Sequence, residues 1–162
     1  MSGTIVYIRI KSSALSMRNV TEGISFEDVP LIAFSKTSKR LLQIGKAAKS
    51  LSNDSDAVVV NGFESPRSII GDFGAAEKTL QHFLKKVEPQ KSWWQFLPFA
   101  PTMIIHPLEK VEGGLTQVEA RALEDLCYRA RAANVYVWTG KILTDAEAKQ
   151  LQFPQEGKLY NH

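Results

Sequence analysis

The chain contains few residues of the kinds that build disulfide frameworks or metal sites. Cys127 is its single cysteine, and its three histidines, His82, His106 and His162, are scattered without the paired spacing of a metal site. One thiol cannot form an internal disulfide, which fits a reducing compartment. The helical spacing of Cys127 from its leucine neighbours predicts a small core residue. We therefore expect no metal site, and a core held by apolar packing alone.

Long apolar runs and a strong charge excess are also missing. No stretch approaches the ~20 apolar residues that span a bilayer, and no export signal is visible at the start of the sequence. The 20 Lys and Arg residues are interspersed with 17 Asp and Glu residues, and a formal net charge of +3 is too small to indicate a nucleic-acid-binding protein. We expect a cytoplasmic globular protein with no nucleic-acid partner.

The most distinctive segment lies near the middle of the chain. Two of the three tryptophans stand there beside two prolines, Pro98 and Pro101, which disfavour a helix. Large aromatic side chains in an irregular segment are either covered by the protein or available to bind something else. The candidate membrane- or partner-binding residues are Trp93, Trp94, Phe96, Leu97 and Phe99.

Three interpretations of this segment are open. The indoles could pack on the protein's own helices, insert into the headgroups of an anionic membrane, or fill the groove of a partner protein. Lys85, Lys86 and Lys91 lie close by in the sequence and would strengthen attraction to an anionic surface.

The pattern of strands and helices predicts an α/β fold, a mixed sheet with packed helices. The chain begins with a meander of about three strands, and two periodic helices then alternate with strands. Thr116 and Glu119 form a capping box at the start of the second helix, and Asn134 is the expected stop. Strands are expected at 4–10, 14–20, 24–26, 30–34, 40–44, 57–60, 102–105 and 135–138, and helices at 46–51, from 75 to 87, from 116, and at 144–151. We expect one domain over 1–154 and a loose tail over 155–162.

Three stretches of the sequence resemble the bacterial actin-like MreB family, the rod shape-determining proteins. They are 23–34, 69–87 and, after the apolar segment, 103–107 with 114–123. The likeness runs from about residue 5 to about residue 138, and it covers only the first part of the family's length. It implies an actin-like (ribonuclease H-like) fold of the kind called subdomain IA, membrane-associated filaments and a role in cell shape. In that family an amphipathic N-terminal segment or an apolar loop of this subdomain touches the membrane, and the loop corresponds to 93–99 here.

The sequence departs from the family at the nucleotide site. The family's first phosphate loop has an Asp-Leu-Gly-Thr pattern, whereas this chain has Arg9, Ile10, Lys11 and Ser12. The family's Glu-Glu-Pro is replaced by 139–141, Thr-Gly-Lys, and nothing here corresponds to the second half of the fold. We therefore expect no catalytic residue, no bound cofactor and no ATP hydrolysis by this chain alone.

We expect a non-catalytic MreB-like protein, cytoplasmic or peripheral at the inner membrane. Its expected partner is an anionic membrane surface, an MreB-like filament or another protein. Two alternatives remain open: half of an ATP-dependent actin-like enzyme that a second chain completes, and an unrelated protein-binding module on the same fold.

Overall fold

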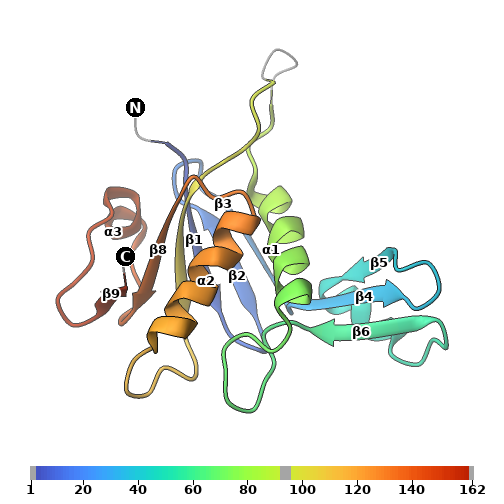
Figure 1. The fold of residues 1–162 in the computed structure, drawn as a ribbon. Coiled ribbons are helices and arrows are strands. Elements are labelled where there is room, and N and C mark those ends of the chain that lie inside the picture. The colour runs from blue at the N-terminus through green and yellow to red at the C-terminus, as the bar shows by residue number, and fades with distance from the viewer. Residues whose placement is uncertain (1–2, 92–95, 161–162) are drawn as a thin grey trace.

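The computed structural model describes residues 3–91 and 96–160 of the chain. A six-stranded mixed sheet, with strand order β3-β2-β1-β7-β8-β9, carries helices on both faces, and a three-stranded antiparallel sheet extends from one side (Figure 1). This architecture confirms the predicted mixed α/β class.

The predicted opening meander is present. β1 (Ile5–Ile10), β2 (Leu15–Asn19) and β3 (Ile24–Asp28) pair antiparallel in sequence order. The next strands leave this sheet: β4 (Leu31–Ser35), β5 (Leu41–Ile44) and β6 (Ala57–Asn61) form the small sheet in the order β5-β4-β6. The 3₁₀-helix η1 (Gly45–Leu51) packs on this small sheet.

Two crossover connections place parallel strands beside β1. After α1 (Phe73–Val87), β7 (Thr102–Pro107) pairs parallel with β1, and after α2 (Gln117–Arg129), β8 (Asn134–Thr139) pairs parallel with β7. The capping box at the start of α2 is confirmed. Asn134 is not the helix stop that the sequence suggested, because α2 ends earlier and Asn134 begins β8.

Alternation along the strands divides the buried side chains between two cores. Val6 and Ile8 of β1 point to the larger core under α1 and α2, whereas Ile5 and Tyr7 point to the opposite face. The second face is covered by α3 (Asp145–Gln150) and neighbouring residues. Strands of this sheet therefore bury both faces, as in other α/β folds with crossover helices.

The segment expected to be a loose tail contributes a strand. β9 (Lys158–Tyr160) pairs antiparallel with β8, and Tyr160 Oη accepts a hydrogen bond of 3.0 Å from the amide of Leu115. Three residues are too short for a period-two pattern, so the sequence did not reveal this strand. No helix in the described part of the chain is both long and apolar enough to cross a bilayer.

Candidate functional site

The connection between α1 and β7 projects beyond the body of the protein at one end of the sheet (Figure 1). Phe96 and Leu97 lie on this loop with relative exposures of 88% and 82%. Large apolar side chains are normally buried, so such exposure costs free energy unless a partner covers them. Two of the predicted binding residues, Trp93 and Trp94, fall outside the described residues.

The base of the loop is held by specific contacts. The Lys91 ammonium donates a hydrogen bond of 2.9 Å to the carbonyl of Leu97 and forms an ion pair of 3.0 Å with Glu88. Phe99 is partly buried against the main core. Of the predicted binding residues, Phe99 therefore anchors the loop, and Phe96 and Leu97 are presented to the outside.

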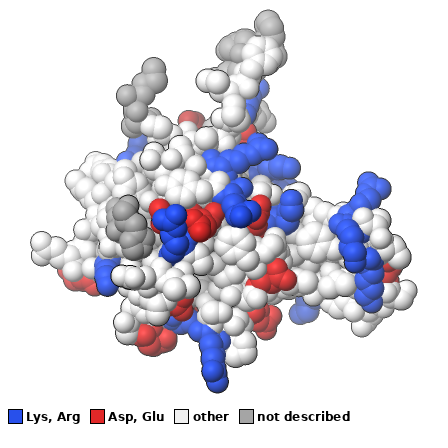
Figure 2. All heavy atoms as spheres, in the orientation of Figure 1, with Lys and Arg blue, Asp and Glu red and all other residues white. Residues whose placement is uncertain are grey.

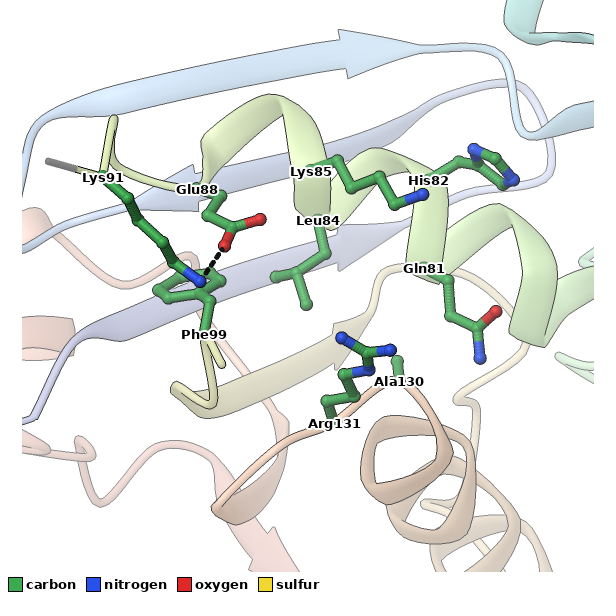
Figure 3. A pocket seen from close by; sticks show the side chains of 9 residues that line it. All are labelled: Gln81, His82, Leu84, Lys85, Glu88, Lys91, Phe99, Ala130 and Arg131. Atoms are coloured by element: carbon green, nitrogen blue, oxygen red, sulfur yellow. Dashed lines mark ion pairs between the residues drawn. The ribbon is translucent and has the colours of Figure 1, made fainter. Parts of the chain in front are cut away.

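A small pocket of about 190 Å³ lies beside the base of the loop, between α1 and the end of α2 (Figure 3). Its lining comes from three parts of the chain that are distant in sequence. The lining residues are Gln81, His82, Leu84, Lys85, Glu88, Lys91, Phe99, Ala130 and Arg131. Three cations and one carboxylate therefore surround this pocket, and Lys and Arg side chains gather on the same face below the loop (Figure 2).

Arg131 reaches the pocket because of the way α2 ends. Its φ of 77° is left-handed, and its amide donates to the carbonyl of Tyr128, which closes the last turn. Figure 3 shows the guanidinium directed from this turn toward Leu84 of α1. Sequence reasoning missed Arg131, since more than thirty residues separate it from the apolar loop and no motif marks it.

The positions expected to replace the phosphate loop, Arg9 to Ser12, lie at the end of β1 and in the tight turn that leads to β2. The amide of Lys11 donates to the carbonyl of Ala14 over 2.9 Å, and Arg9 donates to the Ser16 hydroxyl over 3.1 Å. The amides of Lys11 and Ser12 are therefore both taken up by contacts within the chain.

Two side chains that sequence reasoning did not single out complete this turn. The Glu109 carboxylate accepts from the Ser12 amide, and the Asn61 side-chain amide donates to the Ser12 carbonyl over 2.7 Å. The Ser12 bond, helped by nearby Lys110 and Lys11, holds the pKa of Glu109 below its ordinary value. A cavity of about 10 Å³ beside Ser12 and Glu109 is at the lower limit of the space that one ordered water requires.

His106 is buried in a satisfied hydrogen-bond chain. Its Nε2 lies 3.1 Å from the carbonyl of Gly140, which can only accept, so Nδ1 accepts from the Tyr7 hydroxyl at 2.7 Å. Tyr7 Oη in turn accepts from the amide of Leu143 over 3.1 Å. Burial lowers the pKa of His106 to about 4. These contacts give the ring a structural role between β1, β7 and the segment before α3.

Cys127 lies fully buried in the main core, where burial raises the pKa of its thiol far above the ordinary value. A thiol held in its neutral form is a poor nucleophile, so the position agrees with the predicted core role. In the described ranges, 3–91 and 96–160, no three His, Cys, Asp or Glu side chains come together as a metal-binding group.

Comparisons with known proteins place these features in a family. The chain is 38% identical over 65 residues to the uncharacterized protein YjaA of Escherichia coli strain K12, covering 40% of this chain and 51% of YjaA. It is 28% identical over 120 residues to the cell shape-determining protein MreB of Haemophilus influenzae, covering 72% of this chain and 32% of that protein. The chain thus spans about half of the length of the first relative and about a third of the second.

Solved structures show the same fold. The crystal structure of MreB5 of Spiroplasma citri bound to AMPPNP aligns with a TM-score of 0.64 and 17% identity, covering 85% of this chain and 38% of that one. The ADP-bound structure of the same protein aligns with a TM-score of 0.64, 18% identity and coverage of 83% and 37%. The family described as MreB/Mbl protein matches residues 14–147, so the chain belongs to the MreB/Mbl family.

Proposed function

We propose that this chain is a non-catalytic MreB-family protein that binds an anionic membrane surface through the loop between α1 and β7. The carrying observation is the exposure of Phe96 and Leu97, at 88% and 82%, on a loop that projects beside a group of cations. The apolar side chains of the loop suit the acyl-chain region of a membrane interface. The Lys and Arg side chains at the base of the loop suit the anionic headgroups.

The magnitudes suit reversible binding. Burying a Phe or Leu side chain stabilises by roughly 1.5–3 kcal/mol, and each Lys or Arg near an anionic surface adds about 1 kcal/mol. Phe96 and Leu97 with Lys85, Lys91 and Arg131 would together supply a few kcal/mol after the cost of ordering the loop. That is the strength of a peripheral protein, and the binding should weaken with salt.

The cellular role that we propose is in bacterial cell shape, at the inner membrane. It is supported by the similarity to the Haemophilus influenzae protein, which is named as cell shape-determining. An MreB-family filament is a further proposed partner at that surface, and the small share of the relative that this chain covers leaves the contacts with such a filament to experiment.

The non-catalytic part of the proposal is supported by the turn after β1. Ser12 already has its amide and carbonyl bonded to Glu109 and Asn61, and a carboxylate at this place repels a phosphate. A second candidate is a nucleotide-binding half that another chain completes, and it is favoured by the fold shared with the nucleotide-bound Spiroplasma citri protein. We prefer the first, because the contacts that close the turn belong to this chain.

Co-sedimentation with lipid vesicles tests the proposal. The wild-type protein should bind vesicles containing phosphatidylglycerol more than vesicles of phosphatidylcholine alone. The double variant Phe96→Ser/Leu97→Ser should lose at least nine-tenths of this binding, because each change removes apolar area from the tip. Val118→Ser is the matched control, since Val118 is 78% exposed on α2 and lies outside the loop. Equal binding by all three proteins, or none by the wild type, would refute the proposal.

A further inference from the structure

We propose that the pocket between α1 and the end of α2 binds a phosphate anion. The inference deepens the proposed membrane function. It rests on that function where the phosphate belongs to a lipid headgroup. The pocket lies beside the base of the loop (Figure 3), and Phe96 and Leu97 are exposed on that loop. A headgroup phosphate in the pocket and an apolar tip in the interface could therefore be engaged at the same time.

The charges around the pocket are unbalanced. Lys91 is paired with Glu88, the one carboxylate of the lining, at 3.0 Å. Lys85 and Arg131 have no ion-pair partner within the described ranges. Two cations from different elements therefore line one pocket without an ion-pair partner, and a guanidinium is suited to bind two phosphate oxygens together.

Helix ends alone do not account for these cations. A cation near a helix C-terminus balances a partial charge of about −0.5, and the ends of α1 and α2 both lie here. Three cations exceed Glu88 by two charges, so about one positive charge remains after both helix ends are counted. One carbonyl at the end of α2 already has a hydrogen-bond donor, because the Gln81 side chain donates to the carbonyl of Arg129 over 3.1 Å.

The size and lining of the pocket fit a small anion with water. Its volume of about 190 Å³ exceeds several-fold the roughly 30 Å³ that a water molecule occupies in the liquid. Leu84, Phe99 and Ala130 supply apolar walls that lower the local dielectric and strengthen attraction between the cations and a bound phosphate.

His82 provides a local reporter. Its pKa is lowered by burial and then by the positive charges of Lys85 and Lys78. A phosphate bound beside Lys85 would cancel part of that positive field, so the pKa of His82 would rise.

The test uses the full chain with two probes, soluble glycerol phosphate and vesicles of phosphatidylglycerol in phosphatidylcholine. Calorimetry measures the binding of glycerol phosphate, and NMR titration of His82 accompanies it. Co-sedimentation measures the binding of the vesicles. The pocket variant is Lys85→Gln/Arg131→Gln. The matched control is Lys49→Gln/Arg67→Gln, which removes the same charges from exposed positions away from the pocket. Thermal unfolding checks that both variants fold.

Support for the pocket is a tenfold or larger loss of glycerol phosphate binding in the pocket variant, with the control variant near wild type. Saturable glycerol phosphate binding together with a raised His82 pKa, but no vesicle binding, would assign the pocket to a free phosphate ester and would end the membrane proposal. Loss confined to vesicles would reflect only the general attraction of Lys85 and Arg131 to an anionic surface and would overturn the pocket.

Other results overturn the inference. If the pocket and control variants bind both probes equally, or if the wild type binds neither, the pocket holds no phosphate. If Phe96→Ser/Leu97→Ser abolishes vesicle binding while the pocket variant matches the control, the membrane function stands and the pocket proposal fails.

Discussion

The carboxylate of Glu109 accepts a hydrogen bond from the backbone amide of Ser12, joining the segment after β7 to the turn after β1. The same turn is also bonded by Asn61, the last residue of β6 in the small sheet. Three segments distant in sequence thus meet at this turn.

Replacing Glu109 by alanine should destabilise the fold by about 1 kcal/mol, because the Ser12 amide loses a charged acceptor that is only partly shielded from solvent. Urea unfolding measures the change. Glu112→Ala is the matched control, since Glu112 is exposed on the same segment and should change stability little. Equal effects of the two substitutions would mean that the Ser12 bond contributes nothing.

The purified chain should show no binding of Mg-ATP in isothermal titration calorimetry. The sequence predicts that Lys11 replaces the family's glycine, and the amides of Lys11 and Ser12 are bonded to Ala14 and Glu109. Micromolar binding by the isolated chain would contradict this account and would favour the nucleotide-binding half. ATP turnover above background would contradict it equally.

Stability should fall as the pH drops from about 6.5 to about 4. The pKa of His106 is lowered from 6.5 to about 4, so the unfolded chain binds this proton at a higher pH than the folded chain does. Proton binding therefore stabilises the unfolded state in that window, and the free energy of unfolding decreases. The full contribution is about 3 kcal/mol for a shift of this size. Urea unfolding at several pH values measures it.

The variant His106→Gln should lose most of this pH dependence, whereas His82→Gln should retain it. The pKa of His82 is also lowered, but its ring is less buried than that of His106. Carboxyl groups with lowered pKa, such as Glu147, act mainly near and below 4.5. An unchanged pH profile in His106→Gln would show that the buried ring is not the source.

Replacing Gly157 by alanine should destabilise the protein by about 1–3 kcal/mol, because a Cβ there would overlap the ring of Trp138. Gly74→Ala is the control: it lies in the first turn of α1 with its nearest neighbour at 3.6 Å, and alanine favours the helix by about 0.5–1 kcal/mol. Thermal unfolding compares the two. A neutral Gly157→Ala would mean that the C-terminal segment packs loosely after all.

Much of the fold could be predicted from the sequence because local patterns dominate it. The helical period of α1, the capping box of α2 and the apolar run of β7 were each readable in isolation. The features that the sequence did not predict depend on strands that are distant in the chain. β4 has an ordinary strand sequence, and nothing local says that it pairs with β6 in place of β3. β9 is formed because the edge of β8 offers hydrogen bonds.

The site was predictable only in part for the same reason. The apolar loop is one continuous segment, so Phe96 and Leu97 could be named as candidates from the sequence directly, and their role in binding stays a prediction. The anchoring of Phe99 was not foreseen. Arg131 and Glu109 lie beside residues that are distant in the sequence: Arg131 lines a pocket with residues of α1, and Glu109 bonds Ser12. Their contacts with the pocket and the turn arise from the packing of α1 against α2 and of β7 against β1.

The most direct test of the account is quenching of tryptophan fluorescence by brominated phosphatidylglycerol vesicles. Trp138 is buried in the second core, so lipid bromine can report only on Trp93 and Trp94 in the loop segment. We predict a blue shift with anionic vesicles and strong quenching by bromine near the headgroups. Both should disappear in Phe96→Ser/Leu97→Ser. Unchanged emission at saturating lipid would contradict membrane binding by this loop.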